Sequence, residues 1–115
     1  MTRGGRILCW VYGIIAAIAL YATWNHNLAF FGTPNNGGIA GFMRDAYVNH
    51  ASSSFANDLF AFGIAGVIFM IAEARRVSVP RVWLYIAISL LIAISVGFPL
   101  FLIERQVALA KRMTS

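Results

Sequence analysis

Charged residues are scarce in this sequence, and acidic residues are scarcer still. Nine lysine and arginine residues and four aspartate and glutamate residues make up only 11% of the 115 residues. Soluble domains carry about 25% charged residues, so this composition excludes an ordinary water-soluble domain. The formal net charge of +5 does not indicate nucleic-acid binding, because most basic residues lie at the ends of apolar stretches rather than in one patch.

Cysteine and recognisable catalytic motifs are also nearly missing. Cys9 is the single cysteine, so no intrachain disulfide can form, and we interpret it as a small buried hydrophobe. The sequence contains no nucleotide-binding glycine loop, no nucleophile elbow and no haem-attachment motif. The motifs therefore identify neither an enzymatic reaction nor a cofactor.

Three long apolar stretches dominate what is present. They predict transmembrane helices at about residues 7–24, 55–73 and 82–103, each near the ~20 residues that cross a ~30 Å hydrocarbon core. We predict an all-α fold, a three-transmembrane-helix bundle that forms a single integral membrane domain over residues 1–115. The first stretch also resembles a signal peptide with a cleavage motif at Ala17-Ile18-Ala19, but Cys9 lies at its front and we expect an uncleaved helix.

The polar segment between the first two stretches, residues 25–54, is too long for a passive turn and is expected to be structured. Asn25-His26-Asn27 is expected to end the first helix. Apolar residues from Ile39 to Tyr47 recur at i, i+3, i+4, i+7 and i+8, which predicts a short amphipathic helix lying flat at the membrane interface. Ser52-Ser53-Ser54 offers an N-cap to the second apolar helix.

Small residues within the apolar stretches are expected to let helices approach closely. Gly13 and Ala17 lie four apart in the first stretch, and Gly63 and Gly66 lie in the second. Gly97 lies in the third, before Pro99, whose missing backbone donor predicts a kink. Charged residues at the helix ends are expected to be structural anchors: Glu73, Arg75, Arg76 and Arg105.

Asp58 is the ionisable residue of most interest, because it lies one turn into the second apolar stretch. A structural interpretation places it at a helix end, favoured by the helix dipole and partnered by Arg105. A functional interpretation makes it an acid that binds a proton or a ligand inside the bilayer. His26 and His50 are candidate cofactor-binding residues on the same side, but their spacing predicts no metal site.

The basic residues also bear on orientation. With three spans, five of them lie on the side of the N-terminus and four on the other side. Cytoplasmic loops carry the excess of lysine and arginine, so the sequence predicts a cytoplasmic N-terminus and an external C-terminus by a narrow margin.

From about residue 40 to residue 105, the chain resembles a family of small bacterial membrane proteins known only as a domain of unknown function. The resemblance implies a three-helix bacterial membrane protein and implies no activity. We expect the protein to lie in the bacterial cytoplasmic (inner) membrane. The resemblance rests on four segments and one arginine: Ser54-Phe55-Ala56-Asn57-Asp58-Leu59, Glu73-Ala74-Arg75-Arg76, Trp83-Leu84-Tyr85, Ser95-Val96-Gly97-Phe98-Pro99-Leu100-Phe101-Leu102 and Arg105.

Three functions remain open at this point. The first is a non-enzymatic accessory or scaffold subunit of a larger membrane assembly, whose partners are membrane lipids and other transmembrane helices, in a homo- or hetero-oligomer. The second is binding or conversion of a lipophilic molecule, such as an isoprenoid, quinone or pigment, at one membrane face near Asp58. The third is a small proton-coupled transporter, although the first apolar stretch contains no carboxylate or histidine.

Overall fold

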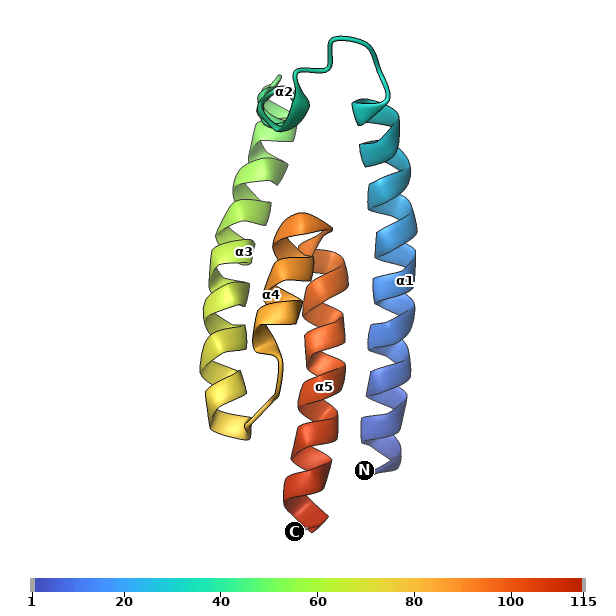
Figure 1. Ribbon diagram of the computed structural model, residues 1–115, viewed down its shortest axis with the longest axis vertical. Helices are drawn as coiled ribbons and strands as arrows, with labels where there is room; N and C mark the ends of the chain where they lie inside the picture. Colours follow the sequence, from blue (N-terminus) through green and yellow to red (C-terminus); the bar gives the residue numbers. More distant parts are fainter. Residues whose placement is uncertain (1, 115) are drawn as a thin grey trace.

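The computed structural model describes residues 2–114, and in that range it consists of five α-helices without a strand (Figure 1). The all-α prediction is therefore confirmed, whereas the predicted number of three helices is not matched. The helices form an elongated bundle of 55 × 24 × 23 Å. Their bounds are α1 Arg3–Phe31, α2 Gly38–Ala46, α3 His50–Val77, α4 Val82–Leu91 and α5 Ile94–Thr114.

Helix α1 is longer than predicted. Thr2 caps its start by accepting a hydrogen bond from the Gly5 amide at 3.0 Å. The helix then continues through Asn25-His26-Asn27, so the prediction that this tripeptide ends the helix is wrong. No glycine or proline lies between Gly13 and Gly32, and the Gly32 amide closes the last turn on the Leu28 carbonyl at 2.9 Å.

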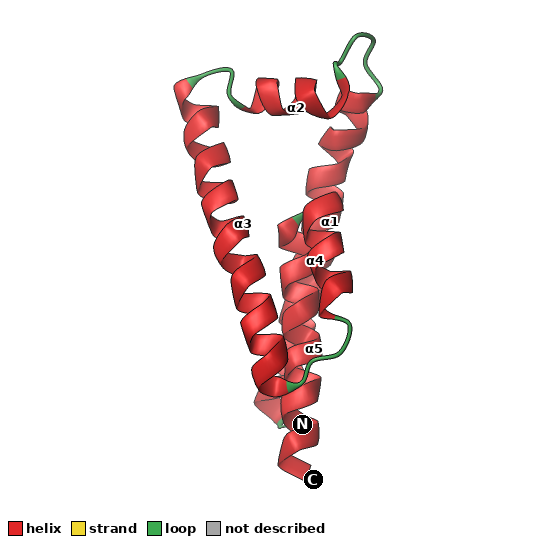
Figure 2. Ribbon diagram, turned by 60° about the vertical axis from the view of Figure 1, so that its left-hand side comes forward, coloured by secondary structure: helices red, strands yellow, loops and turns green. Residues whose placement is uncertain are grey.

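The short helix α2 confirms the amphipathic segment predicted at residues 39–47, and it lies across the end of the molecule between α1 and α3 (Figure 2). Helix α3 begins at His50 rather than after the serine run, which corrects the predicted cap. Asn49 is the actual N-cap, because its side chain accepts from the Ser52 amide at 2.8 Å while the Ser52 hydroxyl accepts from the Asn49 amide at 3.3 Å.

The third apolar stretch is not one helix, and this is the main correction to the predicted fold. Helix α4 ends at Leu91, the chain reverses at Ile92-Ala93, and α5 returns antiparallel to α4 (Figure 1). Both termini consequently lie at the same end of the structure, so the expected placement of the C-terminus opposite the N-terminus does not hold. Pro99 lies inside α5, and the break comes before it rather than at it.

The buried core lies where α3, α4 and α5 meet, towards the end that carries the termini. Phe101, Met70 and Val77 are its largest fully buried side chains, and Tyr85 meets Phe101 edge to face at 6.1 Å. Helix α1 packs chiefly on α5. Helices α1 and α3 are the two helices long and apolar enough to cross a membrane among the described residues.

Candidate functional site

The reversal between α4 and α5 depends on one glycine. A Cβ atom on Gly97 would lie 2.1 Å from the Ser89 Oγ atom and 2.7 Å from both the Ser89 amide nitrogen and the Tyr85 carbonyl oxygen. Real Cβ atoms do not come so close to backbone atoms, so only glycine lets the two helices touch here. The Ser89 hydroxyl donates to the Tyr85 carbonyl at 2.7 Å and is thereby satisfied in a buried position.

The tip of this hairpin is held by the neighbouring helix α1. The Trp24 indole Nε1 donates a hydrogen bond of 2.8 Å to the Ile92 carbonyl oxygen. Within the turn, the Ala93 amide donates to the Ile88 carbonyl at 3.1 Å, and the Val96 and Gly97 amides both donate to the Ala93 carbonyl at 3.0 Å. These bonds satisfy several of the backbone groups that two adjoining helix ends leave without intrahelical partners.

Beyond the tip lies an open, mostly apolar cavity of about 640 Å³. The hairpin tip lines one end of the cavity, and α1 and α3 line its sides. Phe42 of α2 lines it as well. Small-molecule sites occupy about 300–1,000 Å³ and are lined mainly by apolar side chains, so this cavity has the size and lining of one. Representative lining residues are Thr23, Asn27, Leu59, Phe60, Gly63 and Ala93.

Helix α2 is fixed over this end of the molecule by aromatic and polar contacts. Phe42 stacks on Phe31 at 5.7 Å and meets Phe30 edge to face at 5.3 Å, which joins α2 to the end of α1. On the other side, the Tyr47 hydroxyl donates to the Asn57 side-chain oxygen of α3 at 2.9 Å. The amphipathic helix therefore bridges the two long helices above the cavity.

The opposite end of the bundle holds a network of ion pairs. The buried Glu73 carboxylate of α3 accepts from the Arg105 Nε of α5 at 2.9 Å and from the Arg76 Nε at 3.1 Å. A second pair joins Arg81 to Glu104 at 2.6 Å across the base of the hairpin. Arg81 has a φ of 58°, a left-handed conformation that is unusual for a non-glycine residue.

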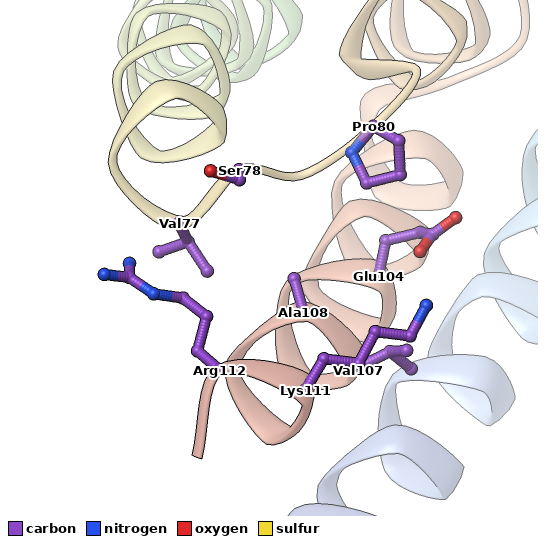
Figure 3. A pocket seen from close by; sticks show the side chains of 8 residues that line it. All are labelled: Val77, Ser78, Pro80, Glu104, Val107, Ala108, Lys111 and Arg112. Carbon is purple, nitrogen blue, oxygen red and sulfur yellow. The ribbon is translucent and has the colours of Figure 1, made fainter. Parts of the chain in front are cut away.

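Glu104 illustrates the electrostatics at this end. Burial raises the pKa of its carboxyl, but hydrogen bonds from Arg81 and Tyr85 and the charges of Arg81 and Lys111 outweigh burial, so the pKa lies below its ordinary value. A second pocket, of about 400 Å³, opens beside Glu104 between the α3–α4 turn and the last turns of α5 (Figure 3).

The residues predicted to be functional, Asp58, His26 and His50, are not among those that line the cavity. Asp58 is exposed and does not line the cavity, and Arg105 pairs with Glu73 instead of Asp58. Asp58 and Glu73 are 15 residues apart on one helix, or about 22 Å. His26 and His50 are both exposed, and no group of three metal-ligating side chains occurs among the described residues.

Of the residues predicted to be structural, some lie between helices and others are exposed. Gly13 faces Ile103 of α5, Gly63 and Gly66 face Ile94 of α5, and these positions therefore do lie between helices. Ala17 is exposed, as is Arg75. Sequence reasoning missed Trp24, Ser89 and the hairpin tip, although the small residues Ser89 and Gly97 in one apolar stretch were a usable signal for close packing of two helices.

Comparison with known proteins bears on the family but not on an activity. No curated protein and no solved structure matches the sequence. A family model described as protein of unknown function DUF2834 matches residues 11–107, which is most of the chain and includes all of α2, α3 and α4 and the larger part of α1 and α5. The chain therefore belongs to the DUF2834 family of proteins of unknown function.

Proposed function

We propose that this protein resides in a membrane and binds a lipophilic small molecule in the cavity above the hairpin tip. The observation that carries the proposal is the cavity itself, an open, mostly apolar space of about 640 Å³ between α1, α3 and the hairpin tip. An isoprenoid, a quinone or a pigment suits such a lining, because the walls bury apolar surface and present few polar groups.

Membrane residence is supported by the lengths and surfaces of the two long helices. With 29 and 28 residues, α1 and α3 extend about 43 Å and 42 Å, enough to cross a ~30 Å hydrocarbon core. Only 6% of the most apolar window of α1 and 17% of that of α3 is buried inside the protein. The apolar side chains therefore point outwards, as they do where lipid replaces water as the solvent.

In that setting the α4–α5 hairpin is a re-entrant element. Helix α4 has ten residues and extends about 15 Å, half the thickness of the hydrocarbon core. Non-helical backbone at such a depth is tolerated where it is buried in protein or lines a cavity. The bond from Trp24 and the position of Ile92 and Ala93 on the cavity wall meet this requirement.

The distribution of basic residues in this arrangement supports one orientation. The end with the termini carries eight basic residues, whereas the end with α2 carries Arg44 alone: the eight are Arg3, Arg6, Arg75, Arg76, Arg81, Arg105, Lys111 and Arg112. Basic residues concentrate on the cytoplasmic side of membrane proteins. We therefore place both termini in the cytoplasm, in a cytoplasmic membrane. Protease access to tags at both ends, in inverted but not in right-side-out vesicles, is the expected result.

The ligand is tested by purifying the full chain in mild detergent and identifying bound organic molecules by mass and absorbance. Gly63→Leu fills part of the cavity and is expected to reduce the bound molecule at least tenfold. Ala61→Leu adds similar bulk at an exposed position of the same helix that does not line the cavity, and it should leave the bound amount unchanged. Equal retention by both variants, or no bound molecule in the parent protein, contradicts the proposal.

A second candidate function, an accessory subunit of a larger membrane assembly, is favoured by the outward face of α1. Trp10, Ile14, Ile18 and Tyr21 form a stripe at helical spacing, and each is more than half exposed. Such a stripe suits a neighbouring transmembrane helix. Co-purification with a larger assembly in mild detergent supports this function, and recovery solely as a monomer under all detergent conditions contradicts it.

A further inference from the structure

The lining of the cavity above the hairpin tip carries no charge. Among the described residues that line it, none is aspartate, glutamate, histidine, lysine or arginine. A charged group that enters such a space from water loses its hydration without gaining a partner of opposite charge, and the cost is large in an apolar medium. A ligand of this cavity therefore has a neutral head.

Four polar residues lie among the apolar ones: Thr23, Asn27, Ser89 and Ser95. Two of them already use their hydroxyl hydrogen within the protein. The Thr23 hydroxyl donates to the Ala19 carbonyl oxygen at 2.8 Å, and the Ser89 hydroxyl donates to the Tyr85 carbonyl oxygen at 2.7 Å. Towards a ligand, these two residues have only acceptor lone pairs to offer.

Asn27 differs from them because its hydrogen-bonding capacity is unused. Its side-chain amide carries two N–H donors and one carbonyl acceptor. The side chain is half-buried and makes no hydrogen bond to another described residue. An unpaired N–H group is tolerated less well in a dry environment than an unpaired lone pair. The cavity therefore needs a hydrogen-bond acceptor from its ligand, beside Asn27.

The position of Asn27 separates a head region from a tail region. Asn27 precedes the last residue of α1 by four positions, or about 6 Å, and so lies towards the end that α2 crosses (Figure 2). Phe42 and Phe60 add aromatic surface to the lining. Along α3 the lining continues from Leu59 to Ile68, about 14 Å away from α2 (Figure 1). This wall suits an apolar tail.

We propose, on the basis of the cavity function proposed above, that the ligand is a neutral quinone. A ring carbonyl oxygen accepts from the Asn27 side-chain amide, and the apolar tail follows α3 towards Ile68. A quinone brings carbonyl acceptors without a donor or a charge, and its flat ring suits the aromatic surfaces of Phe42 and Phe60. Asn27 is then the residue that determines specificity for a carbonyl head.

The test is a binding titration of the full chain in mild detergent with four defined probes. Decylubiquinone carries the carbonyl head, decylbenzene has the same chain and no oxygen, 4-decylphenol has a hydroxyl head, and geranylgeranyl phosphate has an anionic head. Decylubiquinone is expected to bind about tenfold more tightly than decylbenzene and 4-decylphenol, since hydrogen bonds to its carbonyl are the difference. Geranylgeranyl phosphate should bind more weakly still.

Matched variants assign this preference to Asn27. Asn27→Leu keeps a similar volume and removes both donors, so it should weaken decylubiquinone about tenfold and leave decylbenzene unchanged or bound more tightly. Asn25→Leu makes the same change at an exposed position of the same helix outside the lining, and should change neither titration. Asn27→Gln retains the donors and should keep most of the binding, and circular dichroism should show unchanged helix content in all variants.

The outcomes separate recognition of the head from the cavity itself. Equal binding of decylubiquinone and decylbenzene, or equal effects of Asn27→Leu and Asn25→Leu, refutes the carbonyl contact. The lipophilic cavity still stands in that case if Gly63→Leu weakens both probes. If none of the four probes binds, the cavity function fails together with the quinone. Tighter binding of 4-decylphenol, lost in Thr23→Val, or tighter binding of geranylgeranyl phosphate also refutes the quinone.

Discussion

The contact at Gly97 gives the sharpest test of the hairpin. Gly97→Ala places a methyl group 2.1 Å from the Ser89 Oγ atom and 2.7 Å from two backbone atoms of α4. Overpacking of a well-packed site costs about 1–3 kcal/mol, occasionally more. Replacing glycine by alanine inside a helix recovers about 1 kcal/mol. Because backbone atoms cannot rotate away, we expect the upper part of the range, a net loss of about 2 kcal/mol in the free energy of unfolding.

The control for this substitution is a helical glycine of α3 that faces α5. A Cβ on Gly63 meets only the Ile94 Cδ1 atom at 3.8 Å, an ordinary van der Waals contact. Gly63→Ala is therefore expected to be neutral or to stabilise the protein by up to about 1 kcal/mol. The measurement is unfolding by sodium dodecyl sulfate in mixed micelles, followed by circular dichroism, for both variants and the parent.

A double substitution tells side-chain from backbone crowding. Ser89→Ala removes the nearest atom to the new methyl group but leaves the Ser89 amide and the Tyr85 carbonyl in place. The double variant with Gly97→Ala should therefore regain only part of the lost stability. If Gly97→Ala unfolds at the same detergent concentration as Gly63→Ala, the two helices do not touch at this point and the hairpin geometry is refuted.

Three other predictions concern single polar groups. Trp24→Phe removes the indole donor to the hairpin tip and should lower the free energy of unfolding by about 1 kcal/mol. The helix content measured by circular dichroism should not change. Glu73→Gln breaks the ion pairs of Glu73 with two arginines and should lower the free energy of unfolding by about 2 kcal/mol. In the same assay, Asp58→Asn at an exposed position should change it by less than about 0.5 kcal/mol. A larger loss for Asp58→Asn than for Glu73→Gln contradicts the assignment of Glu73 as the buried acid. Because the folded pKa of Glu104 lies below its ordinary value of about 4.5, the Arg81 pair stabilises the protein fully above pH ~4.5 and loses this contribution as pH falls through the folded pKa; Glu104→Gln should show a smaller loss in acid unfolding curves.

The sequence predicts most of the helical elements because their signals are local. The apolar stretches give α1 and α3, and the spacing of Ile39, Phe42 and Met43 gives α2. Boundaries were less predictable, since Asn25-His26-Asn27 are compatible with a helix that ends or continues, and Asn49 competes with three serines as a cap. These differences are a few residues long and leave the arrangement of the helices unchanged.

The candidate site was predictable only in part, because it is defined by tertiary contacts between apolar residues. Leu59, Phe60 and Ile64 line the cavity but have no chemistry that marks them in a sequence. Asp58, His26 and His50 were predicted as candidates because they are ionisable, but all three are exposed in the structure. The buried acid is Glu73. Because Glu73 lies close to Arg75 and Arg76 in the sequence, it was interpreted as part of an ordinary charged helix end.

The hairpin escaped prediction because local rules do not distinguish it from a span. Residues 82–103 would extend about 33 Å as one helix, and Leu90 to Ile94 contain neither glycine nor proline. Global charge does distinguish the two. A single span divides the nine basic residues five to four between the two sides, whereas the hairpin divides them eight to one. Membrane proteins concentrate lysine and arginine on one side, so the near-even division was evidence against three spans. If the division of basic residues is compared for a span and for a hairpin at each apolar stretch, charge alone favours the observed reversal.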